Sequence, residues 1–357
     1  MAKGRRAKVV EASGSYEAMG SKVGSACRRE VRGMLGAARE NLQRRSLDWE
    51  RSKVNAAKHL PFVEAYNPDQ IAYVRGYSKG SGVPFEDLFL SFCLDEKGLC
   101  SDIMVNGEAT ADGGVYSAHT EDWTPLSEQF LVLLRCRPKG RPSALVMTMG
   151  GLEWITGLNS AGITLTGNSL YQNDTRVGVP KLMVAPKVLA STTPGEALAA
   201  ATPPHRASSY NNNITHSSGE MYCVEGTATD FAVLCPERGF LVHTNHYLHP
   251  RLAQYETAFG GPGVRTIEGA SSTIVRYHRA LRLIRSQLGQ VTKESLMEVM
   301  RDHVNRPGSI CRHADRGLPA HEQTKTTYSI VLDPVKLKMH LCMGNPCEGE
   351  FVEHGLR

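Results

Sequence analysis

The feature that most constrains the fold of this chain is a change of hydrophobic periodicity at Cys100. Before Cys100, apolar residues recur every three or four positions, as over 15–45, which predicts amphipathic helices. After it, short runs that alternate polar and apolar residues predict strands. We therefore expect a largely helical segment, 1–99, followed by a strand-rich catalytic segment, 100–357. No Pro-rich linker or repeat separates them, so we expect one domain.

Local end signals refine the predicted elements. Pro68 and Pro84 favour helix starts, and Thr193 with Glu196 is a capping box. Helices are predicted over 15–45, 70–79, a segment after Pro84, 179–190, 194–201, 272–288 and 293–304. Strands are predicted over 102–105, 115–119, 130–135, 144–149, 163–168, 221–225, 231–234, 241–244, 327–332 and 337–343. This order favours an α+β fold in which two antiparallel sheets stack between helix layers, a four-layer αββα sandwich.

Composition and charge exclude several classes of protein. With 41% hydrophobic and 22% charged residues, the chain of 357 residues is typical of globular proteins. No basic motif interleaved with aromatic residues accompanies the net charge of +5, so we expect no nucleic-acid partner. No apolar run suits a membrane span or a secretory signal, so we expect no membrane association and a cytoplasmic location. A homo-oligomer is left open.

The nine cysteines do not predict a metal centre. Cys342 and Cys347 lack the Cys-x-x-Cys spacing and the second ligand pair of a zinc site. Most of the others are embedded in apolar segments, where a cysteine is usually a small buried hydrophobe. We therefore expect no bound metal and no resident cofactor.

The surroundings of Cys100 set it apart from the other cysteines. It opens a strand, and a turn at 112–114 returns the chain as a second strand toward Asp122. If the Leu99–Cys100 bond is cut, the new α-amine, with a pKa of about 7.7 to 8.0, can serve as base for the thiol. From the residues alone, two alternatives stay open, a buried structural cysteine and a cysteine protease that uses a histidine.

Six segments in chain order carry a resemblance to a known family. They are 100–101, 107–113, 121–123, 157–162, 243–246 and 309–312. Together they resemble the acyl-coenzyme A:6-aminopenicillanic-acid acyltransferase (isopenicillin-N acyltransferase) family, in the choloylglycine-hydrolase-like group of N-terminal-nucleophile (Ntn) hydrolases. The resemblance implies that Cys100 is the nucleophile and that Asp122 lies beside the freed amine. It further implies that Asn245 and Asn168 serve the oxyanion, and that Arg312 neighbours the nucleophile.

The resemblance also implies an activity and a maturation step. The family is made as a precursor that cuts itself, here between Leu99 and Cys100, so the N-terminal segment becomes a partner of the catalytic one. A thioester on Cys100 would pass an acyl group from a small N-acyl amide to water or to an amine. Acyl transfer from a coenzyme A thioester to a β-lactam-type or other amine is an alternative. Because most relatives have Gly where this chain has Leu99, an unprocessed binding protein with an inactive site is another.

Overall fold

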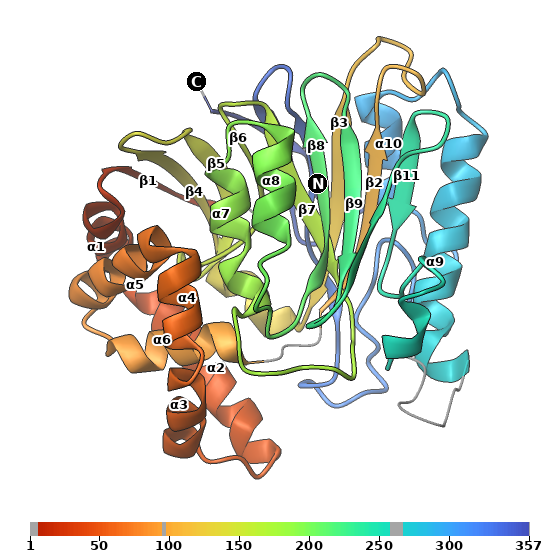
Figure 1. Cartoon of the computed structure of the whole chain (residues 1–357). Coiled ribbons are helices and arrows are strands. Elements are labelled where there is room, and N and C mark those ends of the chain that lie inside the picture. The colour runs from red at the N-terminus through yellow and green to blue at the C-terminus, as the bar shows by residue number, and fades with distance from the viewer. Residues whose placement is uncertain (1–5, 95–97, 258–266, 357) are drawn as a thin grey trace.

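The computed structural model describes residues 6–94, 98–257 and 267–356. In this part of the chain the strands form two stacked sheets, a larger one of eight strands and a smaller one of six (Figure 1). Helices α7 (Ala185–Leu189) and α8 (Pro194–Ala201) cover the outer face of the larger sheet, and α9 (Ile267–Arg285) and α10 (Lys293–Met300) cover that of the smaller sheet. The predicted α+β sandwich is therefore confirmed. No helix among the described residues is long and apolar enough to cross a membrane.

The N-terminal segment is helical, as predicted, except for one strand. β1 (Lys8–Gly14) pairs in parallel with β4 (Leu131–Pro138) at the edge of the larger sheet, whereas the sequence pattern predicts only antiparallel pairing. The helix predicted over 15–45 is two helices, because the backbone leaves the helical conformation at Cys27. The helices are α1 (Tyr16–Ala26), α2 (Arg28–Arg44), α3 (Trp49–Ala57), α4 (Leu60–Tyr66), α5 (Pro68–Ser81) and α6 (Phe85–Cys93), of which α3 and α4 were not predicted.

The larger sheet runs in the order β1-β4-β5-β6-β7-β8-β9-β10. After β1 its strands are β4 (Leu131–Pro138), β5 (Ala144–Met149), β6 (Glu153–Asn159), β7 (Ile163–Ser169), β8 (Tyr210–His216), β9 (Met221–Gly226) and β10 (Phe231–Leu234). β6 and β8 were not predicted. β8 carries asparagines at 211, 212 and 213, which are usually depleted in strands, yet all three are buried here.

The smaller sheet runs in the order β11-β2-β3-β12-β13-β14. Its strands are β11 (Phe240–His243), β2 (Leu99–Val105), β3 (Tyr116–Trp123), β12 (Lys325–Asp333), β13 (Lys338–Met343) and β14 (Val352–Gly355). The described residues also form three short 3-10 helices, η1 (Pro125–Phe130) between β3 and β4, η2 (Lys181–Met183) before α7, and η3 (Ala253–Tyr255) before α9. The helix predicted over 179–190 is therefore η2 followed by α7.

Strand alternation in β2 decides which way the Cys100 side chain points. Ile103 and Val105 pack in a hydrophobic cluster with Ala280 and Ile284 of α9. Met104 instead packs against residues of β9, in the larger sheet. Because Cys100 and Met104 share a face of the strand, the Cys100 thiol points between the two sheets.

Candidate active site

Cys100 lies near the start of β2, buried between the sheets, with 2% of its surface exposed. β2 and β3 pair antiparallel, with Leu99 opposite Asp122 and Cys100 opposite Glu121. The hairpin predicted from the sequence is therefore confirmed. Its register places Glu121, not Asp122, directly across from the cysteine.

The backbone of Cys100 is held by two polar side chains. Its amide N–H donates to Oδ1 of Asn245 over 3.0 Å. Arg276, fully buried on α9, donates from Nη1 to the Cys100 carbonyl and from Nη2 to the same Oδ1 of Asn245, over 2.7 Å. The side-chain nitrogen of Asn245, Nδ2, donates to the carbonyl of Ser169 over 3.1 Å. In this intact chain Asn245 thus binds the nitrogen that would become the α-amine.

Asp122 belongs to a separate ion pair. Its Oδ2 accepts from Nε of Arg312 over 3.2 Å, and its Oδ1 accepts from the Thr326 hydroxyl over 2.7 Å. Since neighbouring residues of a strand point to opposite faces, Asp122 faces the helix layer while Glu121 faces the larger sheet. Burial raises the pKa of Asp122, and the charges of Arg312 and Arg276 oppose that shift.

The Cys100 thiol starts a chain of buried ionisable groups. It donates to Oε1 of Glu121 over 3.2 Å, and the other carboxylate oxygen lies 3.2 Å from Nε2 of His119. Nδ1 of His119 lies 3.1 Å from Oδ1 of Asp102. At most 3% of each of these residues is exposed. The thiol is therefore connected through a carboxylate and an imidazole to a second carboxylate.

The protonation of this chain follows from its burial and its charges. Burial and the negative charge of Glu121 raise the pKa of the Cys100 thiol well above its usual range. Burial also raises the pKa of Glu121. For His119, burial acts to lower the pKa, but the carboxylates of Asp102 and Glu121 outweigh it and raise the pKa to about 10. Cys100 is therefore a neutral thiol that needs a base, and His119 is an imidazolium.

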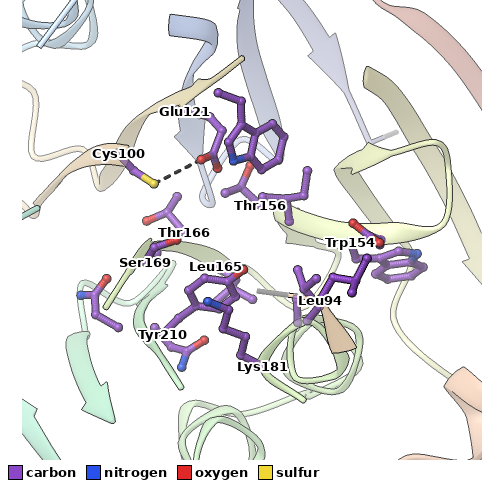
Figure 2. A pocket seen from close by; sticks show the side chains of 18 residues that line it. Leu94, Cys100, Glu121, Trp154, Thr156, Leu165, Thr166, Ser169, Lys181 and Tyr210 are labelled. Atoms are coloured by element: carbon purple, nitrogen blue, oxygen red, sulfur yellow. Dashed lines mark hydrogen bonds between the residues drawn. The ribbon is translucent and has the colours of Figure 1, made fainter. Parts of the chain in front are cut away.

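A pocket opens beside the thiol, between the sheets (Figure 2). Cys100 and Glu121 form one side, and Lys181 and Tyr210 lie across the pocket from them, with the Lys181 ammonium 4.6 Å from the centre of the Tyr210 ring. The rest of the lining combines apolar side chains with hydroxyl, amide and carboxyl groups. The apolar residues are Leu94, Trp123, Trp154, Ile155, Leu165, Leu182 and Ala185, and the polar ones are Thr156, Thr166, Ser169, Asn211, Asn212 and Glu153. The nucleophile candidate thus faces a space that has apolar walls and a few polar groups, as small-molecule sites do.

A family model described as acyl-coenzyme A:6-aminopenicillanic acid acyl-transferase matches residues 109–348. The chain belongs to this family. A curated relative is the 40 kDa form of the acyl-coenzyme A:6-aminopenicillanic-acid-acyltransferase of Emericella nidulans, 26% identical over 242 residues, which are 66% of this chain. The match spans 63% of that relative, less than two thirds of its length.

Two solved structures are also similar. One is the C2A mutant of the conjugated bile acid hydrolase from Clostridium perfringens, with a TM-score of 0.46, 13% identity, and coverage of 71% of this chain and 96% of that one. The other is penicillin V acylase from Agrobacterium tumefaciens, with a TM-score of 0.44, 15% identity, and coverage of 68% and 82%.

Of the residues that the family resemblance implied, Asn245 contacts Cys100 and Asp122 pairs with Arg312. The arginine that contacts the Cys100 backbone is Arg276, whereas Arg312 donates to Asp122 and to the Ser272 hydroxyl. Arg312 instead forms an ion pair with Asp122, the residue that follows Glu121 on β3. Asn245 contacts Cys100 as expected of a site residue.

Asn168 makes its described side-chain contact with a histidine of β11. Its Oδ1 accepts from Nδ1 of His243 over 3.0 Å, and its side chain is not part of the described pocket lining. Its side-chain nitrogen, Nδ2, is buried with no hydrogen-bond partner among the described residues. A role for Asn168 at the oxyanion stays a prediction.

Two site residues were missed, and each left a signal in the sequence. Arg276 follows Thr273 and precedes Ala280 at helical spacing, so an arginine stood on the inward stripe of an amphipathic helix. Glu121 precedes Asp122 on a strand, where alternation allows only one of the two to share a face with Cys100. Only the register of the hairpin, which the sequence does not fix, decides between them.

Proposed function

We propose that this protein is a self-processing Ntn cysteine amidohydrolase or acyltransferase, which cuts its own Leu99–Cys100 bond and then acts on small N-acyl amides. One observation carries the proposal: both reacting atoms of Cys100 have side-chain acceptors. Its nitrogen binds Asn245, and its sulfur binds the buried carboxylate of Glu121. A merely structural cysteine requires neither contact.

In the first step of this proposal, the chain cuts itself. Glu121 takes the thiol proton, and the Cys100 sulfur attacks the Leu99 carbonyl carbon. The bond from that carbon to the Cys100 nitrogen then breaks, and the nitrogen takes up a proton. Water hydrolyses the resulting thioester, which leaves a carboxylate on Leu99 and a free thiol and α-amine on Cys100.

In the second step the matured residue acts on a substrate. The α-amine, held by Oδ1 of Asn245, takes the thiol proton, and the sulfur attacks the acyl carbon of the amide. The amine of the substrate leaves with a proton, and the acyl group remains on sulfur as a thioester. Water or another amine then accepts the acyl group. The aromatic and aliphatic walls of the pocket favour an apolar acyl group.

The remaining expectations are part of the same proposal. The cleaved N-terminal segment stays bound as a partner, since α1 and α2 pack on strands of the larger sheet. The protein needs no resident cofactor for this chemistry, and a coenzyme A thioester would be a co-substrate. A cytoplasmic location and a homo-oligomeric state also remain proposals.

The proposal predicts two fragments, which intact-mass analysis and N-terminal sequencing can detect. The 39.1 kDa chain should become pieces of about 11 and 28 kDa by residue share, the larger one beginning at Cys100. Cys100→Ala should stay intact, whereas Cys235→Ala, which changes an exposed cysteine, should be cut like the wild type. Cutting of Cys100→Ala would reveal a foreign protease. An intact wild type that still hydrolyses amides would refute self-processing, and an intact, inactive wild type would favour the binding-protein alternative.

A further inference from the structure

Four side chains that take no part in the site described above converge where the segment after α10 meets the segment after β13. Among the described residues, His303, Cys311 and His313 lie between α10 and β12, and Cys347 lies between β13 and β14. Their ligand atoms, Nε2 or Nδ1 of each histidine and Sγ of each cysteine, all lie within 4.8 Å of one another. We call these four residues the Cys2His2 cluster.

The distances inside the cluster match those of a tetrahedral zinc site. Zinc bonds of about 2.3 Å to sulfur and 2.0–2.1 Å to nitrogen give edges of about 3.3 to 3.8 Å between ligand atoms. The two sulfurs are 3.5 Å apart, and Nε2 of His313 lies 3.7 Å from Cys311 Sγ and 3.4 Å from Cys347 Sγ. The two Nε2 atoms are 3.1 Å apart. Two sulfur and two nitrogen ligands are thus spaced as if around one small ion.

Groups around the cluster also resemble the outer shell of a metal site. Nδ1 of His313, the ring nitrogen turned away from the sulfurs, faces Oε1 of Glu348 at 3.9 Å. The side-chain nitrogen of Asn345 lies 3.5 Å from Cys311 Sγ and donates over 2.6 Å to the carbonyl of Arg312. A carboxylate behind a histidine and an N–H directed at a sulfur orient ligands in known metal sites.

We propose that the Cys2His2 cluster binds one Zn²⁺ ion as a closed, structural site. Both cysteines would bind as thiolates and both histidines as neutral imidazoles, so binding releases two thiol protons and leaves the site without net charge. This inference reverses the sequence-based expectation of no metal. The ligand spacing, with seven residues between His303 and Cys311 and one between Cys311 and His313, has no Cys-x-x-Cys pair to signal it.

The ion would position a residue of the candidate active site. Arg312 stands between two of the ligands in sequence, and its Nε donates to Asp122. Its backbone N–H donates over 2.9 Å to the Thr326 hydroxyl, which itself donates to Asp122. Zinc at this point would fix the backbone on both sides of Arg312 and so hold the Asp122 carboxylate. The metal would be structural, because all four positions of the tetrahedron are protein ligands.

The test uses the full-length protein, reduced and stripped of metal with a chelator. Zn²⁺ is then titrated in competition with a chromophoric chelator, and Co²⁺ is added separately as a spectroscopic probe. We expect one Zn²⁺ per chain, and Co²⁺ spectra with thiolate charge-transfer bands and the intense visible bands of a tetrahedral site. Cys235→Ser, which removes an exposed cysteine outside the cluster, should match the wild type.

Two ligand variants make the test specific. Cys347→Ser and His303→Gln change residues at the surface, so both should fold. Each should weaken Zn²⁺ binding by more than the roughly 10–100-fold typical of outer-shell changes. Reduced wild type that binds no Zn²⁺, or binds it no better than Cys347→Ser, would overturn the proposal. If the reduced wild type fails to bind while the oxidised protein loses two hydrogen atoms in mass and peptide mapping joins Cys311 to Cys347, these two cysteines form a disulfide and not a metal site.

Discussion

At the residue scale, the contact between Cys100 and Glu121 determines how the thiol can lose its proton. A buried thiolate next to a buried carboxylate would place two negative charges in a medium that solvates neither. One proton must therefore stay on the pair, and burial raises the pKa of both groups. The proton can move between the Cys100 sulfur and the Glu121 carboxylate oxygen, which lie 3.2 Å apart, without exchange with the solvent. In the intact chain, where Cys100 has no free amine, Glu121 is the base within reach.

Replacing this carboxylate tests that role. Glu121→Gln keeps the shape of the side chain but cannot accept the thiol proton, so we expect self-cleavage to slow by about 10²- to 10⁴-fold, the usual contribution of a general base. It also removes a negative charge that raises the thiol pKa, so that pKa should fall. Cleavage is followed by intact mass, and the thiol pKa by alkylation rate against pH in denaturant-free buffer.

The matched control is Glu108→Gln, which changes an exposed carboxylate on the same hairpin and should be cleaved at the wild-type rate. Cleavage of Glu121→Gln at the wild-type rate would contradict a role as base. A lower thiol pKa alone would favour the thiolate and speed cleavage, so slower cleavage despite a lower thiol pKa indicates loss of the base.

At the scale of elements, the closest packing in the N-terminal segment is between α1 and α5. A Cβ added to Gly76 would lie 2.0 Å from the Glu17 carbonyl oxygen, and one added to Gly20 would lie 2.0 Å from that of Tyr73. The backbones of α1 and α5 are thus in direct contact at Gly20 and Gly76. The Tyr73 hydroxyl then donates over 2.6 Å to the Gly151 carbonyl, which ties α5 to the turn before β6.

This packing predicts a large effect of one methyl group. Gly76→Ala must push two backbones apart, and we expect it to lower the free energy of unfolding by about 1–3 kcal/mol or more. Gly36→Ala is the matched control, since a Cβ there meets nothing within 4 Å, and it should stabilise α2 by roughly 0.5–1 kcal/mol. Urea unfolding, with Cys100→Ala in every variant to keep the chain intact, measures both. Equal stabilities for the two would contradict the close packing.

The elements also show how far sequence patterns reach. The hairpin at Cys100, the capped helix α8 and the strand β10 were predicted because each has a local signal. β8 was missed because its asparagines are buried for tertiary reasons: Asn211 donates to Asn213 over 2.8 Å and accepts from the backbone of Asn168. The contact with Asn168 joins segments 43 residues apart in the chain, and single-sequence patterns do not contain it.

The same limit applies to the candidate site. Cys100, Asp122 and Asn245 were predicted from motifs, but the partner of the thiol depends on strand register. The role of Arg276 depends on how α9 docks on β2, which brings its guanidinium to the Cys100 carbonyl. Helix docking and strand register are properties of the packed molecule. The residues of a site can therefore be predicted more reliably than their contacts.

At the scale of the whole molecule, folding encloses a network of charges around Cys100. Asp102, Glu121 and Asp122 are balanced by Arg276, Arg312 and His119 only while His119 carries a proton. This balance explains why the His119 pKa is about 10 despite its burial. Folding therefore takes up a proton at neutral and mildly alkaline pH.

Proton uptake by His119 makes stability depend on pH. Its folded pKa lies above the unfolded value, so the stabilisation is fully present below about pH 6.5 and is lost as pH rises toward about 10. One extra proton in the folded state gives a slope of at most about −1.4 kcal/mol per pH unit. We expect the free energy of unfolding of Cys100→Ala, which lacks the coupled thiol, to fall between pH 7 and 8.5. Urea unfolding at fixed ionic strength measures this slope.

The variants assign the slope to one residue. Adding His119→Gln to Cys100→Ala should lower stability at pH 7 and flatten the profile, because the titrating group is gone while the other cysteines and histidines remain. Adding His321→Gln instead, at an exposed histidine, should leave both stability and slope unchanged. If the profiles with and without His119 run parallel from pH 7 to 8.5, the imidazole is not an imidazolium in the folded protein. Glu121 would then face a neutral ring, and the charge balance around Cys100 would need a different proton.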